Sequence, residues 1–409
     1  MNWFFEIPLP LRAVLVFVVG ACVGGQVNRG IYRLAWFQRR IGPWSLPEDN
    51  APPRRWFDRV PILGWLGLRR ESALHGKCYW LRPLLIELAT GLGLAVLYYG
   101  EMNCWLLPVV TAPPSLLHVQ FLSHAILISL MMVATFIDFD EKMIPDSITL
   151  PGTLAGLGLM AMLPAALPPT LNRVTGLIDQ VVITSPKLWS DWMHGSQGLY
   201  CGLACFAGWV LAILPKTITM RRGLFKCLQY MVVSVFRYST WWLYVVLWLV
   251  GTVLIIYVWT ADGLHWMALF SSLVGMAFAG GLVWMVRIIG SHALDKEAMG
   301  FGDVTLMAMI GSYWGWQASL IIFFLAPFAA VFISLSQWLL TRRKDIAFGP
   351  YLCLGTLIVM LGWPTIWEEK ARDVFNLGWL IPQILAVCLG LMYTLLMFWR
   401  FVQGLVYRD

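Results

Sequence analysis

Two short acidic motifs stand at the ends of long apolar segments in this 409-residue sequence. Phe136-Ile137-Asp138-Phe139 closes one apolar run, and Gly300-Phe301-Gly302-Asp303 opens another. Burying an ionised carboxylate at membrane depth is costly, so such groups are retained where a function needs them. Asp138 and Asp303 are therefore the leading candidates for chemistry.

A pair of carboxylates can hydrolyse an amide bond without a metal or a protein nucleophile. One group takes a proton from water while the other protonates the carbonyl or the leaving nitrogen, and two acids that share a proton can do both. Gly300 and Gly302 allow close backbone packing, or close approach of a peptide, beside Asp303. The hypothesis is an intramembrane aspartyl protease with Asp138 and Asp303 as its catalytic pair and these glycines as supporting backbone.

Each acidic residue also has a purely structural explanation. Asp303 could be an ordinary N-cap at a helix start, and Asp138 could be a solvated acid at the membrane boundary. Asp140 and Asp146 are expected to be loop acids, with Asp146 as the N-cap of the helix that begins at the next residue. The two motifs support the catalytic hypothesis only when they are considered together.

The elements that must position these acids are membrane helices. The chain is 59% hydrophobic and 12% charged, with a mean hydropathy of +0.72, which is typical of a polytopic membrane protein. A spanning helix needs roughly 20 mostly apolar residues. We expect an all-α transmembrane bundle of about 9–11 membrane segments. The candidate spans are about 11–28, 83–100, 117–137, 147–167, 198–215, 241–259, 265–289, 318–340, 350–364 and 379–398, with a shorter apolar segment at 304–316.

The positive residues indicate topology and not nucleic-acid binding, because the net charge of +7 comes from clusters between apolar runs. The first apolar run lacks a preceding basic region and is interpreted as a retained helix. The many arginines in 29–82 place that segment in the cytoplasm and the N-terminus outside. Counting spans then puts Asp138 and Asp303 on the cytoplasmic face, together with the basic stretches at 216–240 and 342–344.

The predicted division of the chain has five parts. They are a first transmembrane helix at 1–28, a cytoplasmic segment at 29–82, transmembrane helices with the first catalytic aspartate at 83–168, an insertion at 169–264 with two extra helices and a basic amphipathic stretch, and transmembrane helices with the second catalytic aspartate at 265–409. The eight cysteines form no disulfide framework or complete zinc signature, and the histidines show no metal-ligand spacing. No metal site is expected.

Several ordered blocks resemble the bacterial type IV prepilin peptidases, which are aspartyl proteases with a Gly-x-Gly-Asp motif. The blocks are 25–34, 60–66, 82–88, 137–151, 296–303, 306–316 and 347–351. The resemblance covers most of residues 20–168 and 265–365 and implies that Asp138 and Asp303 are the catalytic pair. It also implies an inner-membrane enzyme that removes the basic leader of a prepilin or pseudopilin-like substrate, after a glycine at the cytoplasmic face.

The resemblance also bears on cofactors. It implies none for proteolysis, whereas many family members methylate the new N-terminus with S-adenosylmethionine, an activity associated with a cytoplasmic region that carries two Cys-x-x-Cys pairs. Here the region around 60–66 holds only Cys78. A zinc site is therefore not expected, and methylation with S-adenosylmethionine is left open.

Other polar residues near the motifs could position the substrate. Glu87 could receive the cationic leader or could pair with Arg82, and Lys296 and Glu297 could orient substrate or could be solvated loop charges. The residues kept as candidates for substrate positioning are Glu87, Lys296, Glu297, Asp140 and Asp146.

Two alternatives from other functional classes are considered. Paired acids in a membrane can form the proton or cation relay of a transporter, although relays usually lie near the bilayer midplane in a repeated scaffold. The missing cysteines and the insertion are compatible with a catalytically idle scaffold relative. The pilin or secretion system served, the role of the insertion and the oligomeric state are not specified by the sequence.

Overall fold

The computed structural model describes residues 7–39, 41–45, 50–109, 111–214, 237, 239–341 and 348–406. The basic stretch predicted at 216–240 falls largely outside these ranges, and the one at 342–344 falls wholly outside them.

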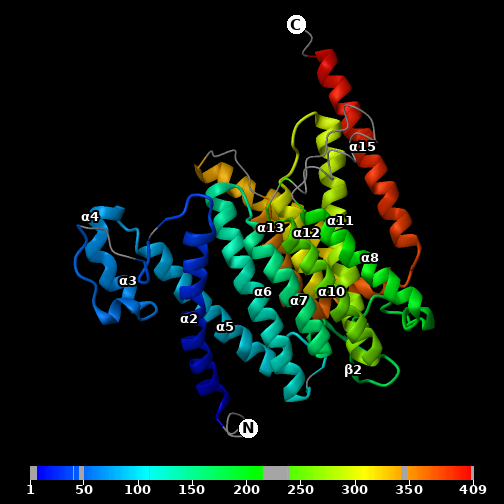
Figure 1. Ribbon diagram of the computed structural model, residues 1–409, viewed down its shortest axis with the longest axis horizontal. Helices are drawn as coiled ribbons and strands as arrows, with labels where there is room; N and C mark the ends of the chain where they lie inside the picture. The colour runs from blue at the N-terminus through cyan, green and yellow to red at the C-terminus, as the bar shows by residue number, and fades with distance from the viewer. Residues whose placement is uncertain are drawn as a thin grey trace.

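Long helices build the protein (Figure 1). The main helices are α2 (Leu9–Leu34), α5 (Leu81–Met102), α6 (Pro114–Glu141), α7 (Asp146–Met162), α8 (Ser196–Ile213), α10 (Trp241–Ala261), α11 (Gly263–Leu294), α12 (Phe301–Thr341), α13 (Gly349–Leu361) and α15 (Leu380–Val406). The shorter elements are η1 (Trp56–Arg59), α3 (Leu63–Leu68), η2 (Arg69–Glu71), α4 (Ser72–His75), η3 (Pro164–Ala166), β1 (Pro169–Leu171), β2 (Ile178–Gln180), η4 (Asp191–Met193), the π-helix η6 (Thr365–Ala371) and α14 (Arg372–Phe375).

The predicted all-α polytopic bundle is confirmed. Among the described residues, eight helices are long and apolar enough to cross a membrane, or nine if α13 and the segment after it, bent by 84°, count as one span. Only 6% of the apolar window of α10 and of α15 is buried inside the protein. Their exposed faces are those expected of helices that contact lipid. The protein is a multi-pass membrane protein.

Small residues let α11 and α12 pack with their backbones in contact. A Cβ atom on Gly275 would overlap the carbonyl oxygen of Gly311, and a Cβ on Gly311 would overlap that of Gly275. Glycine is the residue that permits such an approach between membrane helices. Farther along α12 the chain kinks at Gly315, whose φ of 70° and ψ of −178° suit glycine alone. The sequence-based break between 304–316 and 318–340 corresponds to this kink.

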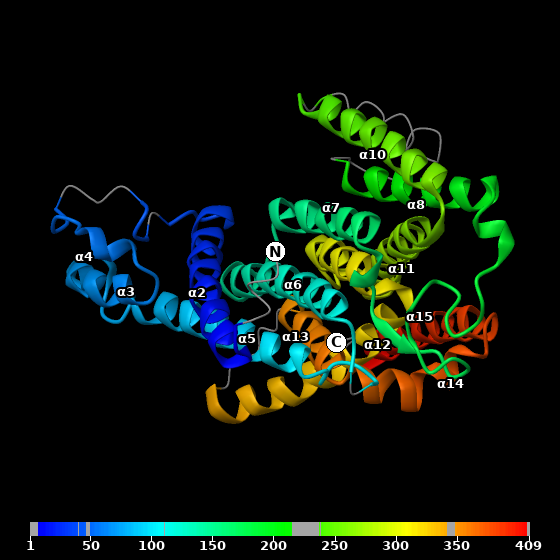
Figure 2. The same cartoon turned by 90° about the horizontal axis from the view of Figure 1, so that it is seen from below.

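The N-terminal segment between α2 and α5 is held together by buried ion pairs. Figures 1 and 2 show α3 and α4 on the far side of α2 from the bundle. Arg70 Nη1 donates to Asp58 Oδ1 at 3.1 Å, and Arg54 Nε lies 3.2 Å from Glu71 Oε1. Both carboxylates are buried. These contacts join the segments on either side of residues 60–66. Many members of the resembled family carry two Cys-x-x-Cys pairs in this region.

A two-stranded hairpin links the insertion to the C-terminal third of the chain. Strands β1 and β2 pair antiparallel, with Thr170 opposite Asp179. Thr170 Oγ1 and the N–H of Leu171 both donate to Glu368 Oε1 at 2.7 Å, and Trp363 Nε1 donates to the carbonyl of Pro169 at 2.7 Å. The hairpin therefore fixes the bend that follows α13. The five-part division of the chain remains a prediction, although α8 and α10 are two helices within 169–264.

Candidate active site

Asp138 lies in the last turn of α6. The helix ends at Glu141, and Lys142 follows in the left-handed conformation with its N–H donating to the carbonyl of Asp138 at 2.9 Å. The Asp138 side chain is 5% exposed and lies against the backbone of Gly349 at the start of α13. Its Oδ2 atom is buried and has no hydrogen-bond partner among the described residues. Asp138 is therefore a buried acid and not a solvated one.

Asp303 lies in the first turn of α12. The helix begins at Phe301, so Asp303 is its third residue and not the N-cap that a purely structural explanation would require. Its side chain is 8% exposed. A helix N-terminus favours a negative charge, which makes this an acceptable place for a buried carboxylate.

The glycines before Asp303 differ in what they do. A Cβ on Gly302 would come within 2.9 Å of Ile144 Cβ and 3.0 Å of the carbonyl oxygen of Ile144, so its lack of a side chain lets α12 start against the loop after α6. A Cβ on Gly300 would meet Asp303 Oδ2 at 3.9 Å, an ordinary contact distance. Close packing thus requires glycine at 302, whereas Gly300 leaves open space beside the carboxylate.

Three helix ends converge on the two acids. Ile144 packs at Gly302, and a Cβ on Gly349 would lie 2.7 Å from Ile144 Cδ1 and 2.6 Å from Asp138 Oδ2. Both carboxylates are buried, and they lie within electrostatic range of each other. The chain therefore brings together two acids that are far apart in sequence.

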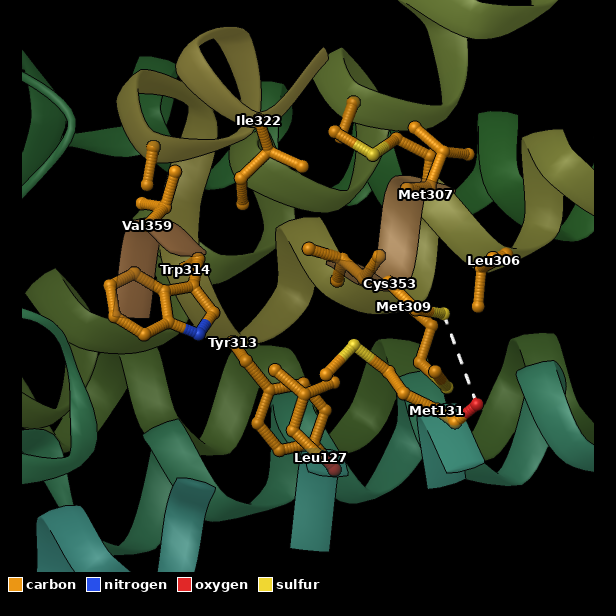
Figure 3. Close-up of a cluster of buried hydrophobic side chains, with 14 of the residues drawn as sticks. Leu127, Met131, Leu306, Met307, Met309, Tyr313, Trp314, Ile322, Cys353 and Val359 are labelled. Carbon is orange, nitrogen blue, oxygen red and sulfur yellow. Dashed lines mark hydrogen bonds between the residues drawn. The ribbon is translucent and has the colours of Figure 1, made fainter. Parts of the chain in front are cut away.

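A buried thiol lies beside the same two acids. Cys353, in the first turns of α13, lies within electrostatic range of both Asp138 and Asp303. Its Sγ hydrogen-bonds the carbonyl oxygen of Met131 at 3.9 Å, and Figure 3 shows side chains of α6, α12 and α13 meeting around it. This close-packed core determines the positions of the helix ends that carry the acids.

The predicted pairing of Glu87 with Arg82 was wrong. Arg82 binds Asp140 instead, with Nη1 at 2.8 Å from Oδ2 and 3.0 Å from Oδ1. Glu87 is 3% exposed and accepts from Trp65 Nε1 at 2.7 Å and from the N–H of Ile62 at 2.6 Å. Its oxygens are thus used to attach α3 to α5, which leaves little capacity to receive a cationic leader.

The remaining positioning candidates are close in sequence to the two acidic motifs. Glu297 forms an ion pair with Arg287 at 2.6 Å, and Lys296 is exposed in the same loop. The N-cap role expected for Asp146 was wrong, because α7 begins at Asp146 with Pro145 as its N-cap residue and no side-chain cap. Asp146 lies near Thr305, whose hydroxyl donates to the carbonyl of Gly302 at 3.1 Å.

Sequence reasoning missed the part played by Gly349. The motif at 347–351 was noticed as part of a family resemblance, but no residue in it was assigned a role. The available signal was a glycine directly before Pro350 at the start of an apolar run, which suits a helix N-terminus. The described residues contain no group of three or more His, Cys, Asp or Glu side chains placed to hold a metal ion.

Beside Glu87 lies a pocket of about 730 Å³ between the end of α2 and the segment leading to α3. Neither Asp138 nor Asp303 lines it. It is therefore a separate site.

Comparisons with known proteins agree on one family. Residues 224–335 match the profile of the "Type IV leader peptidase family", a range that contains Asp303 but not Asp138. The chain is similar to proteins named "Prepilin leader peptidase/N-methyltransferase" from Myxococcus xanthus strain DK1622 (34% identity) and Klebsiella pneumoniae (28% identity). The first match spans 37% of this chain and 41% of the relative, and the second spans 50% and 88%.

A third relative with the same name, from Escherichia coli strain K12, is 38% identical over 85 residues, which are 20% of this chain and 38% of the relative. The chain thus spans less than half the length of two of these three relatives. No solved structure matches it.

Proposed function

We propose, because the chain belongs to the type IV leader peptidase family, that it is a membrane aspartic endopeptidase with Asp138 and Asp303 as its catalytic pair. The observation that carries the proposal is geometric. The buried carboxylates of Asp138 and Asp303 lie at helix ends that pack around Ile144, and one oxygen of Asp138 has no hydrogen-bond partner among the described residues. A proton or water held between the acids would satisfy that oxygen.

The mechanism follows from the like charges of the pair. Two carboxylates close together in a buried site cannot both be ionised at low cost, so one holds a proton. The ionised acid takes a proton from a water molecule while the oxygen of that water attacks the scissile carbonyl carbon. The protonated acid donates its proton to the carbonyl oxygen. Collapse of the tetrahedral intermediate breaks the carbon–nitrogen bond, and a proton returns to the leaving nitrogen.

The proposed substrate is a prepilin or pseudopilin-like protein with a basic leader followed by an apolar helix. The relatives' name supports this class. Both acids stand within one turn of a helix end, Asp138 near the end of α6 and Asp303 near the start of α12. In such a substrate the scissile bond lies at the boundary between the leader and the apolar helix. That bond can therefore reach acids that lie at the bilayer surface. We propose the inner membrane and its cytoplasmic face, because the arginine-rich segment that follows α2 is attached to the end of α6, where Trp36 and Phe37 donate to Glu141.

The alternatives have less support. A proton or cation relay usually places its acids near the bilayer midplane, whereas these acids lie at helix ends. An idle scaffold relative would not need two interacting buried acids, which cost stability.

Methylation of the new N-terminus would need S-adenosylmethionine, a methyl donor with a positively charged sulfonium group. The pocket beside Glu87 is lined by Arg29, Arg33, Arg39 and Arg59. Like charges repel, so this lining does not fit a sulfonium cation. The proposed activity is proteolysis alone.

The test is cleavage of a synthetic peptide that has a basic leader, a glycine and an apolar segment. The purified full-length protein in detergent should cut after the glycine, as identified by product mass. Asp138→Asn and Asp303→Asn should each abolish cleavage, whereas Asp179→Asn, which changes an exposed acid on β2, should not. Cleavage that persists in either of the first two variants would overturn the assignment.

A further inference from the structure

The pocket beside Glu87 is strongly basic. Arg29 and Arg33 stand one turn apart near the end of α2, and Arg39 follows them in the segment after the helix. Arg59 lines the opposite side, with its guanidinium 5.2 Å from the ring centre of Trp44. Positive charge therefore surrounds the opening from two segments of the chain.

Most of this charge has no hydrogen-bond or ion-pair partner among the residues that the structure describes. No hydrogen bond or ion pair between described residues involves the guanidinium groups of Arg29, Arg33 or Arg39. Among the described lining residues the only acid is Glu87, and its two oxygens already accept three hydrogen bonds. The described pocket wall therefore carries an excess of positive charge, which an anion would neutralise.

A buried acceptor in the same pocket also lacks a partner. Asn28 is 2% exposed, and its Nδ2 donates to the carbonyl of Pro83 at 2.9 Å and to Glu87 Oε1 at 3.2 Å. These two acceptors fix the orientation of the amide. The Oδ1 atom of Asn28 has no hydrogen-bond partner among the described residues. A ligand with a hydroxyl or amino donor near its anionic group would supply one.

The pocket is built in advance by contacts that need no ligand. Arg54 Nη1 donates to the carbonyls of Gly42 and Ser45, each at 2.6 Å, which holds one wall. The backbone N–H groups of Trp36 and Phe37 donate to the carboxylate of Glu141 at 2.7 and 2.9 Å. The segment that carries Arg39 is therefore attached to the end of α6.

We propose that this pocket binds a phosphate-bearing anion. Arginine presents donors in a planar fork that matches phosphate oxygens, and several such groups around one cavity suit a tetrahedral anion better than a cationic leader peptide. Because α2 is a candidate membrane span and the pocket lies at its end, a phospholipid head group can reach it from the bilayer surface. A soluble phosphate compound offers the same chemistry from the aqueous side.

The experiment measures binding and not cleavage, so its result does not depend on the proposed function. Full-length protein is purified in detergent and stripped of lipid. One arm adds phosphatidylglycerol or phosphatidylcholine and counts bound lipid by native mass spectrometry. The second arm titrates inorganic pyrophosphate, and the third S-adenosylmethionine, each followed by thermal unfolding.

The test variant is Arg29→Gln/Arg33→Gln, and the matched control is Arg55→Gln/Arg69→Gln. The control removes two exposed arginines from the neighbouring segment that do not line the pocket. Comparison of the unfolding temperatures without ligand checks that both variants fold. If the test variant does not fold, Arg39→Gln in the segment after α2 replaces it.

A lipid source predicts preferential retention of phosphatidylglycerol, weakened at least about tenfold in the test variant and unchanged in the control. A soluble source predicts the same pattern for pyrophosphate. Equal binding by the wild type and both variants would overturn the proposal, because the binding would then reflect general surface charge. Stabilisation by S-adenosylmethionine but by neither phosphate ligand would overturn it as well.

Discussion

A methyl group added at Gly349 would press directly on the candidate catalytic pair. The Cβ of Gly349→Ala would lie 2.6 Å from Asp138 Oδ2 and 2.7 Å from Ile144 Cδ1, whereas ordinary contact begins at 3.4 Å. The carboxylate or the helix must therefore move by about 0.8 Å, since Ile144 is buried and cannot move away freely. Overpacking of this kind costs about 1–3 kcal/mol.

The expected consequence is a larger loss of rate than of stability. A misplacement of about 1 Å at a reacting group can cost on the order of a hundredfold in rate. We expect kcat for leader-peptide cleavage to fall by about 10- to 100-fold in Gly349→Ala. The unfolding temperature in detergent should fall by only a few degrees, on the order of what about 1–3 kcal/mol produces. The assay is cleavage kinetics with the same peptide substrate, followed by mass spectrometry.

The matched control is Gly355→Ala on the same helix. A Cβ there would lie 3.4 Å from the carbonyl oxygen of Ile322 and farther from other atoms, which is ordinary contact. Gly355→Ala should keep its cleavage rate. Cleavage at the wild-type rate by Gly349→Ala would refute the reasoning, as would an equal loss in both variants.

Three further changes test other parts of the structure. Burial raises the pKa of Asp58, but the hydrogen bonds from Arg70 and from the backbone of Arg55, together with the charges of Arg70 and Arg54, hold that pKa below its usual value. The stability that the ionised carboxylate provides is therefore present above about pH 4 and is lost as the pH falls further. Asp58→Asn should make residues 54–75 sensitive to limited proteolysis at pH 7, at a cost of about 3 kcal/mol, with a difference from the wild type that shrinks in acid. Glu87→Gln should lower the unfolding temperature and leave KM for the leader peptide within about threefold, because the carboxylate binds protein donors; a tenfold rise in KM would contradict this. Gly315→Ala should destabilise the protein by about 1–3 kcal/mol in thermal unfolding, because its backbone angles suit glycine alone; an unchanged midpoint would count against the kink.

The sequence was sufficient for the parts of the structure that depend on local composition. Apolar runs of membrane length predicted the helices, and the interruption near Gly315 appeared as a short segment followed by a full span. The two acids were identified because a carboxylate is conspicuous at the edge of an apolar run. Proximity of the acids was inferred from hydrolytic chemistry and from topology, both of which constrain distant residues.

Contacts between distant segments could not be predicted in the same way. Glu87 was a possible partner of the nearby Arg82, but Arg82 binds Asp140, which is 58 residues away in the sequence. Glu87 accepts a hydrogen bond from Trp65 instead. The role of Gly349 depends on a helix end that packs against α6, which no local pattern encodes. Asp146 was expected to cap its helix, but α7 begins at Asp146 itself and has no side-chain cap.

The central claim is that Asp138 and Asp303 act as one catalytic unit. The most direct measurement compares kcat for leader-peptide cleavage in Asp138→Asn, Asp303→Asn and the double variant. Residues that act as a unit show grossly non-additive effects, so each single variant should lose about as much activity as the double variant. Losses that multiply, or a single variant that retains substantial cleavage, would contradict the claim.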